Sequence, residues 1–136
     1  MKNLEQKAMA YEMYSQQLQA IQNEIASIRA LKNEINKTIE TIENIKLDEE
    51  TLIPVGPGVF LKAKIIEDKA LLGIKSDLFI EKPFNETIEK LKNKLDELDK
   101  VEKEGIKRIE ELSKIILELR KELEEAMKKE KEKKEQ

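Results

Sequence analysis

The feature that most constrains the fold of this chain is a spacing of apolar residues at alternating intervals of three and four. It fills two long segments, one on each side of the middle of the chain. In the first segment the spacing falls on Leu4, Lys7, Tyr11, Tyr14, Leu18, Ile21, Ile25, Ile28, Lys32, Ile35, Ile39 and Ile42. In the second it falls on Phe84, Ile88, Leu91, Leu95, Leu98, Glu102, Gly105, Ile109, Leu112, Ile116, Leu119 and Leu123. This heptad spacing predicts two long helices, each with an apolar stripe, or seam, that needs a partner helix.

Local signals suggest where each helix begins and ends. The first should run from about Asn3 to about Lys46, because no glycine or proline interrupts this stretch. The second should begin at Pro83, since the missing N–H of proline costs nothing in a first helical turn. Glu102 and Gly105 break the second seam, and glycine inside a helix costs about 1 kcal/mol relative to alanine. We therefore expect a register shift or a flexible point near Gly105.

Between the two helical segments, apolar residues alternate with a period of two, as they do in β-strands. Gly56-Pro57-Gly58 and Lys75-Ser76-Asp77 each separate two such stretches. Glycine and proline favour turns, and proline cannot donate to a strand ladder. The insert therefore predicts two small β-hairpins. The expected strands are 52–55 and 59–66 in the first hairpin, and 70–74 and 78–82 in the second.

Together these patterns predict a mainly α fold: a long antiparallel coiled-coil hairpin with two small β-hairpins inserted between its helices. The two seams are similar in length, so antiparallel pairing brings both chain termini to one end and the insert to the other. The expected segments are 1–47 for the first helix, 48–82 for the double hairpin, and 83–136 for the second helix with a charged tail. From Lys128 to Gln136 the chain is almost entirely Lys and Glu. This tail should be a fraying helix end or disordered.

The two predicted hairpins are better explained as a surface for assembly than as a free-standing sheet, because a lone hairpin is marginal in water. On this interpretation the hairpins form an oligomerisation platform. In the alternative, they cap the coiled coil of a monomer. The residues expected in the oligomer interface are apolar strand residues: Leu52, Val55, Val59, Phe60, Leu61, Ala63, Ile65, Leu71, Ile74, Leu78, Phe79 and Ile80.

Composition excludes several classes of function. There is no Cys and no His, which removes thiol and imidazole chemistry, and paired carboxylates such as Glu110-Glu111 are typical of a solvated helix face. We therefore expect no enzyme, no catalytic or metal-ligating residue and no cofactor. A net charge of -3 argues against nucleic acid as a partner. No apolar run reaches the length of a membrane span and the start of the chain has no secretory signal, so we expect a cytoplasmic protein and no membrane partner.

The run Leu52-Ile53-Pro54-Val55-Gly56-Pro57-Gly58-Val59-Phe60-Leu61-Lys62-Ala63 resembles the alpha-type subunit of prefoldin, in which a Pro-Val-Gly-x-Gly turn precedes a Phe-rich strand. Phe79-Ile80-Glu81-Lys82 is similar to the end of the second hairpin in that family. The resemblance implies an ATP-independent holdase whose hairpins join into a platform. It also implies coiled-coil tips that bind unfolded client proteins and pass them to a group II chaperonin. The absence of a Gly-x-x-x-x-Gly-Lys motif agrees with this.

On this resemblance, the client-binding residues lie near the two ends of the chain, which we call the tips. They are Leu4, Ala8, Met9, Tyr11, Met13, Leu119, Leu123 and Met127. Methionine suits such a role because its flexible thioether adapts to many surfaces. In the alternative, the seam residues among them simply bury one another in the coiled coil.

The partner in assembly stays open at this point. Alpha-type subunits usually have a glycine-containing turn in the second hairpin, and this chain has Ile74-Lys75-Ser76-Asp77 there. The difference favours an archaeal, gamma-prefoldin-like chain that assembles with itself into filaments. One alternative is the alpha subunit of a hetero-hexamer with prefoldin beta subunits. Another is a structural coiled-coil filament or spacer without chaperone activity.

Overall fold

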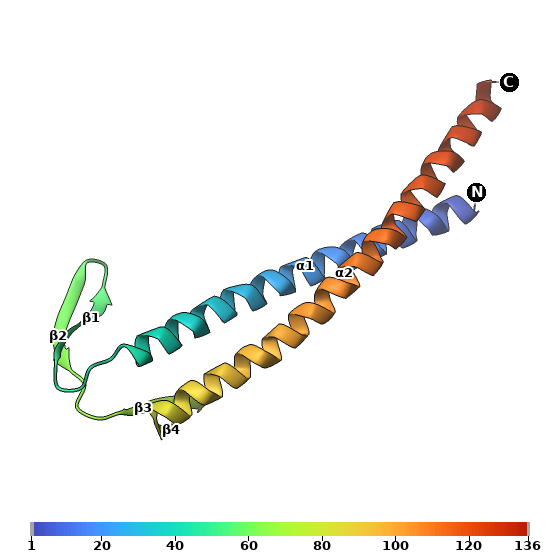
Figure 1. The fold of residues 1–136 in the computed structure, drawn as a ribbon. Coiled ribbons are helices and arrows are strands. Elements are labelled where there is room, and N and C mark those ends of the chain that lie inside the picture. The colour runs from blue at the N-terminus through green and yellow to red at the C-terminus, as the bar shows by residue number, and fades with distance from the viewer. Residues whose placement is uncertain (1, 136) are drawn as a thin grey trace. The chain divides into compact units, whose positions relative to one another are not determined.

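The computed structural model describes residues 2–135 as two long helices separated by two β-hairpins (Figure 1). The elements in chain order are α1 (Lys2–Glu43), β1 (Glu50–Gly56), β2 (Val59–Lys64), β3 (Lys69–Lys75), β4 (Leu78–Pro83) and α2 (Phe84–Glu135). The predicted fold class, mainly α with two small antiparallel hairpins between the helices, is confirmed.

The chain divides into two compact units, and each contains a part of both helices. The first unit comprises 1–30 and 98–136, and the second comprises 31–97 with both hairpins. In the first unit the helices run antiparallel. Lys7 near the start of α1 forms an ion pair with Glu122 near the end of α2 at 3.5 Å, whereas Arg29 pairs with Glu102 at 2.8 Å. The start of α1 therefore lies beside the end of α2, as the seams predicted.

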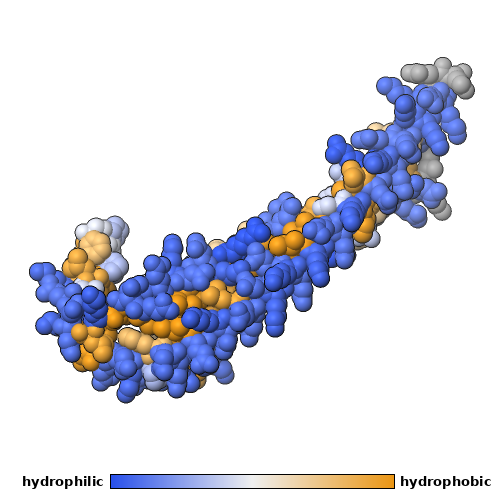
Figure 2. Space-filling model, in the orientation of Figure 1, coloured by the Kyte–Doolittle hydropathy of each residue, from blue (hydrophilic) through white to orange (hydrophobic). Residues whose placement is uncertain are grey.

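The buried apolar residues of both units come from the predicted seams. Ile25, Ile28 and Leu112 are buried in the first unit, and Leu112 is fully inaccessible to solvent. Ile35 and Ile39 are buried in the second unit. Figure 2 shows apolar side chains along the helices flanked by hydrophilic ones. The narrow buried stripe is what a highly charged coiled coil is expected to have.

The two breaks in the second seam have separate structural explanations. Glu102 accepts a hydrogen bond from Nε of Arg29 at 2.8 Å, which compensates the charge of a carboxylate that is only 13% exposed. At Gly105, a Cβ atom would lie 3.1 Å from Cδ1 of Ile25. α2 is helical without interruption through Gly105, so the structure shows no helix break at the point where we expected a weakness. The glycine instead makes room for the buried Ile25 side chain.

Each hairpin is a separate two-stranded antiparallel sheet. In the first, Glu50 pairs with Lys64, Leu52 with Lys62, and Gly56 with Val59 at the turn. In the second, Lys69 pairs with Pro83, Leu71 with Glu81, and Lys75 with Leu78 at the turn. Both turns therefore contain two residues, Pro57-Gly58 and Ser76-Asp77. Gly58 has a φ of 71°, which glycine adopts without steric cost.

Three hydrogen bonds join the hairpins to the chain around them within the second unit. The N–H of Asp48 donates to the carbonyl oxygen of Ile65 at 2.9 Å, and the N–H of Phe84 donates to that of Asp68 at 2.8 Å. The buried hydroxyl of Thr87 donates to the carbonyl oxygen of Pro83 at 2.9 Å. Asp48 has a φ of 62°, in the left-handed region that Asp tolerates better than most residues. The first bond closes the base of the first hairpin, and the other two join the second hairpin to the first turn of α2.

The helix bounds differ slightly from those that we expected. α1 ends at Glu43, three residues before Lys46, and the chain then reaches β1 through a short connection. α2 begins at Phe84, immediately after the proline that we took as its start. The tail that is rich in Lys and Glu continues α2 to Glu135, so in the described residues it is helical rather than disordered. The proposed segment boundaries 1–47, 48–82 and 83–136 stay a prediction.

Candidate functional site

The apolar side chains of both hairpins are exposed in this chain. Among the twelve residues expected in an oligomer interface, ten are large side chains that are at least 39% exposed: Leu52, Val55, Val59, Phe60, Leu61, Leu71, Ile74, Leu78, Phe79 and Ile80. The other two, Ala63 and Ile65, are half-buried near the base of the first hairpin. Exposed apolar residues clustered in this way mark an interaction surface in a soluble protein.

Two further exposed residues belong to the same surface and were not among those predicted. Ile53 is 40% exposed and pairs with Leu61 across the hairpin, so both side chains lie on one face. Ile66, which follows β2, is 73% exposed. Alternate residues of paired strands lie on a common face. This alternation is the sequence signal that could have identified Ile53.

Each hairpin has apolar side chains on both faces. On one face of the first hairpin, Leu52 and Phe60 lie with Glu50 and Lys62, whose side chains form an ion pair at 3.6 Å. The opposite face has Ile53 and Leu61, which pair across the hairpin. In the second hairpin, the ring of Phe79 lies over Gly73, where a Cβ atom would come within 3.3 Å of it. A two-stranded hairpin without a covered face gains little stability by itself, which makes these faces candidates for contact with a partner.

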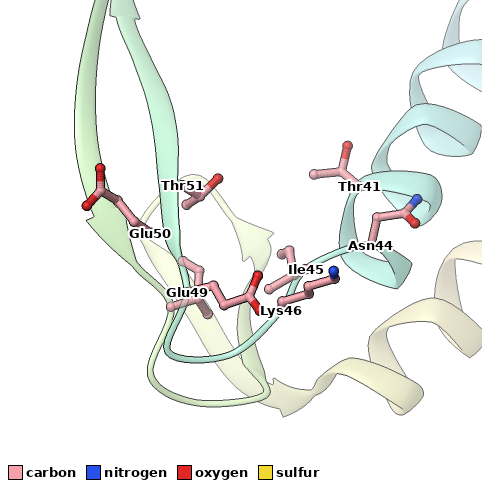
Figure 3. Close-up of a pocket in the computed structure, with 8 residues that line it drawn as sticks. Thr41, Asn44, Ile45, Lys46, Glu49, Glu50 and Thr51 are labelled. Atoms are coloured by element: carbon pink, nitrogen blue, oxygen red, sulfur yellow. The ribbon is translucent and has the colours of Figure 1, made fainter.

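A hollow of about 290 Å³ lies beside the hairpins, where α1 ends and the chain turns toward β1 (Figure 3). Thr41 and Asn44 line it from the end of the helix, and Glu49, Glu50 and Thr51 from the start of the strand. Its side chains are mostly polar, and no group of metal-ligating residues was found here or elsewhere in 2–135. The exposed apolar faces of the hairpins therefore remain the stronger candidate site.

The predicted tip residues all lie in the first unit, and the structure divides them into two groups. Leu4, Tyr11, Leu119 and Leu123 are half-buried, as seam residues of a coiled coil are. Ala8, Met9, Met13 and Met127 are exposed, and the exposed fractions of the three methionines are 72%, 50% and 63%. The exposed group points away from the seam and is free to contact another molecule.

A second apolar feature of the first unit is a hollow near the end of the coil. Leu4 and Ala126 contribute apolar atoms, and Lys129, Lys133 and Lys134 supply long aliphatic stems with charged ends. The opening lies between the start of α1 and the last turns of α2.

No helix in the described part of the chain is long and apolar enough to cross a membrane. This agrees with the charge density of both helices.

Two long helices that flank two exposed hairpins define a class of coiled-coil protein, and comparison with known proteins identifies the family. The family model for prefoldin subunits matches residues 14–129. The chain therefore belongs to the prefoldin family, and the resemblance to alpha-type prefoldin predicted from the sequence is confirmed.

Several archaeal prefoldin alpha subunits are similar to this chain over most of their length. Prefoldin subunit alpha 1 of Methanocaldococcus jannaschii is 69% identical over 121 residues, which cover 89% of this chain and 85% of that protein. Prefoldin subunit alpha of Methanococcus aeolicus is 37% identical over 123 residues, covering 90% and 85%. That of Pyrococcus horikoshii is 31% identical over 133 residues, covering 94% and 90%.

The fold is also similar to that of a solved structure, a filamentous prefoldin from Methanocaldococcus jannaschii determined by cryo-electron microscopy. The TM-score is 0.71 at 19% sequence identity, and the match covers 82% of this chain and 96% of that chain. At this identity the likeness concerns the fold.

Proposed function

We propose that this prefoldin subunit is an ATP-independent holdase that assembles with itself through its β-hairpins and binds unfolded polypeptides at its tips. The observation that carries the proposal is the exposure of apolar side chains on both faces of both hairpins, which leaves each hairpin in need of a partner. It acts without covalent chemistry, since its binding surfaces consist of apolar side chains and exposed charges.

The exposed methionines support the client-binding part of the proposal. Met9, Met13 and Met127 lie outside the buried seam, where apolar side chains contribute little to the stability of the coiled coil. Flexible methionine side chains suit a surface that must accept many different apolar segments. Unfolded proteins expose such segments, so low-specificity binding at these residues would keep clients from aggregating.

A second mode of assembly has an observation in its favour. The relatives described above are named alpha subunits of prefoldin, so a hetero-oligomer with prefoldin beta subunits would use the same hairpin faces. Filament formation is supported by the fold of the filamentous prefoldin, which this chain resembles. Light scattering and negative-stain microscopy of the chain purified alone separate these modes. Filaments support self-assembly, whereas a small discrete species supports a need for beta subunits. Transfer of clients to a group II chaperonin and a cytoplasmic location stay predictions.

The client-binding role is tested by suppression of aggregation of a heated client enzyme. We expect the chain to protect the client, and the variant Met9→Ser, Met13→Ser, Met127→Ser to need about ten times more protein for equal protection, because buried apolar side chains supply most of such binding. The control is Leu31→Ser, which removes an apolar side chain of α1 that is 40% exposed and lies outside the tips. Absence of protection by the wild-type chain at several-fold molar excess would sink the holdase proposal.

A further inference from the structure

The hollow between the start of α1 and the last turns of α2, which we call the tip hollow, has an apolar part and a charged part. Its volume is about 440 Å³. Leu4 and Ala126 are half-buried and form the apolar part. Lys7 pairs with Glu122 at 3.5 Å, so the antiparallel helices bring the start of α1 beside the last turns of α2. Two segments far apart in the chain therefore build one surface.

The charged part of the tip hollow is mainly basic. Lys129, Lys133 and Lys134 line it together with one carboxylate, that of Glu130. The three lysines are exposed, and none of them forms an ion pair within the part of the chain that the structure describes. Their ammonium groups can therefore contact carboxylates of another molecule, while their aliphatic stems cover apolar atoms.

This positive charge is local to one end of the molecule. Residues 126–134 contain five lysines and two glutamates, a net charge of +3, whereas the whole chain carries -3. Of the carboxylates that precede the hollow, Glu122 and Glu124 form ion pairs with basic side chains of the same unit. Glu5 and Glu125 do not line the hollow. A ligand that enters the tip hollow therefore meets basic side chains on an otherwise acidic protein.

We propose that the tip hollow selects, among unfolded polypeptides, segments in which acidic residues stand next to apolar ones. The proposal rests on the holdase function proposed above and adds a charge preference to it. An apolar side chain of the client packs against Leu4 and Ala126, and a neighbouring carboxylate contacts the lysines. Complementary charge favours such segments and disfavours segments rich in lysine.

The spacing of the lysines along α2 suits an extended client. At a rise of ~1.5 Å per residue, Lys129 lies about 4.5 Å and Lys133 about 10.5 Å beyond Ala126 along the helix axis. An extended chain spans roughly 3.3–3.6 Å per residue. In a client segment that runs along α2, acidic residues one and three positions from the apolar residue therefore match these two lysines.

Three synthetic peptides that differ in their polar residues test the preference. Each is an unstructured, fluorescein-labelled peptide with the same leucines, and glutamate, serine or lysine occupies the positions between them. Fluorescence anisotropy with the full chain measures the Kd at low ionic strength. We expect the glutamate peptide to bind about tenfold tighter than the lysine peptide, with the serine peptide between them. The net charge of the chain alone predicts the opposite order. Added salt should reduce the difference, because exposed charges are screened.

Two variants of the lysines that line the tip hollow assign the preference to this site. K129E/K133E/K134E reverses their charge and should reverse the order of the glutamate and lysine peptides. K129Q/K133Q/K134Q removes the charge without adding carboxylates and should abolish the preference. Circular dichroism should report unchanged helix content in both variants, since the altered side chains are exposed.

The matched control is K100E/K103E/K107E. It makes the same change in net charge on three exposed lysines of α2 that belong to the same unit and do not line the tip hollow. This variant should bind the three peptides in the same order as the wild type.

The outcomes separate the charge preference from the holdase function. If the wild type binds the glutamate and lysine peptides equally well, the preference is overturned while the holdase proposal stands. If K129E/K133E/K134E keeps the preference, or if the control loses it to the same extent, the tip hollow is not its source and the inference is overturned. Binding of none of the peptides also overturns it, and protection of a heated client then decides whether the holdase proposal fails as well.

Discussion

Gly105 and Glu102 interrupt the apolar seam of α2 in the sequence, but both contribute to contacts between the two helices. The side chain of Ile25 lies 3.1 Å from the position that a Cβ atom of residue 105 would take, and a hollow of about 230 Å³ beside Gly105 is lined by residues of both helices. Glycine therefore brings α1 and α2 close together at this point. The helix-propensity argument alone described the cost of the glycine and not the contact that it permits.

Enlarging residue 105 should disturb the first unit. Relative to Gly105→Ala, we expect Gly105→Leu to lower the free energy of unfolding by about 1–3 kcal/mol, because the added atoms have to displace Ile25. Alanine and leucine have similar helix propensities, so the comparison isolates packing. Thermal unfolding followed by circular dichroism measures the difference. A leucine variant as stable as the alanine variant would show that the hollow absorbs the larger side chain.

At the scale of the elements, the two hairpins reach the same register with different turn residues. The first turn, Pro57-Gly58, uses a positive φ at Gly58, whereas in 2–135 the one non-glycine residue with positive φ is Asp48. The second turn, Ser76-Asp77, therefore forms without a left-handed residue. This explains why the second hairpin needs no glycine in its turn. The lack of glycine there is compatible with an intact hairpin and says nothing by itself about the partner.

This difference between the turns predicts unequal effects of the same substitution. Gly58→Ala should destabilise the first hairpin by about 1–2 kcal/mol, because a Cβ atom at a φ of 71° clashes with the backbone. Asp77→Ala, at the equivalent position of the second hairpin, should cost clearly less. Amide hydrogen exchange of the strand residues measures both. Equal loss of protection in the two hairpins would contradict this account of the turns.

At the scale of the whole molecule, the two candidate surfaces belong to different units of the chain. The tips lie in the first unit and both hairpins in the second. Each unit has its own buried seam residues, such as Leu112 in the first and Ile39 in the second. We therefore expect client binding and assembly to be separable by mutation.

Two variants test this separation. Phe60→Asp should abolish assembly, because a charge would be buried without a partner in the predicted hairpin interface, and should leave the helix content unchanged. Removal of 1–13 and 119–136 should abolish client protection and leave assembly intact. Negative-stain microscopy and the client assay, applied to both, give the comparison. Loss of assembly in the trimmed chain would place the oligomer contact in the first unit instead.

Much of the fold and part of the site were predictable from local patterns. The seams identified every buried apolar residue in the described chain, including Ile28 and Leu112, because heptad spacing reports which face of a helix is covered. Alternation in the insert identified most of the exposed apolar residues of the hairpins. It missed Ile53, although Leu61, which pairs with Ile53 across the hairpin and shares its face, was among the predicted residues. The equivalent register of the two hairpins became visible once the pairing of Glu50 with Lys64 and of Lys69 with Pro83 was known.

The sequence by itself determined the two helices, the two hairpins and the turn at Gly58, because periodicity and backbone sterics act between residues that are near in the chain. The tertiary structure alone decided how deeply each seam position is buried, which is complete for Leu112 and partial for Tyr11. It also decided that Gly105 receives Ile25, and that Glu102 pairs with Arg29. These contacts join residues far apart in the sequence, and they depend on the register of two helices that no local pattern specifies.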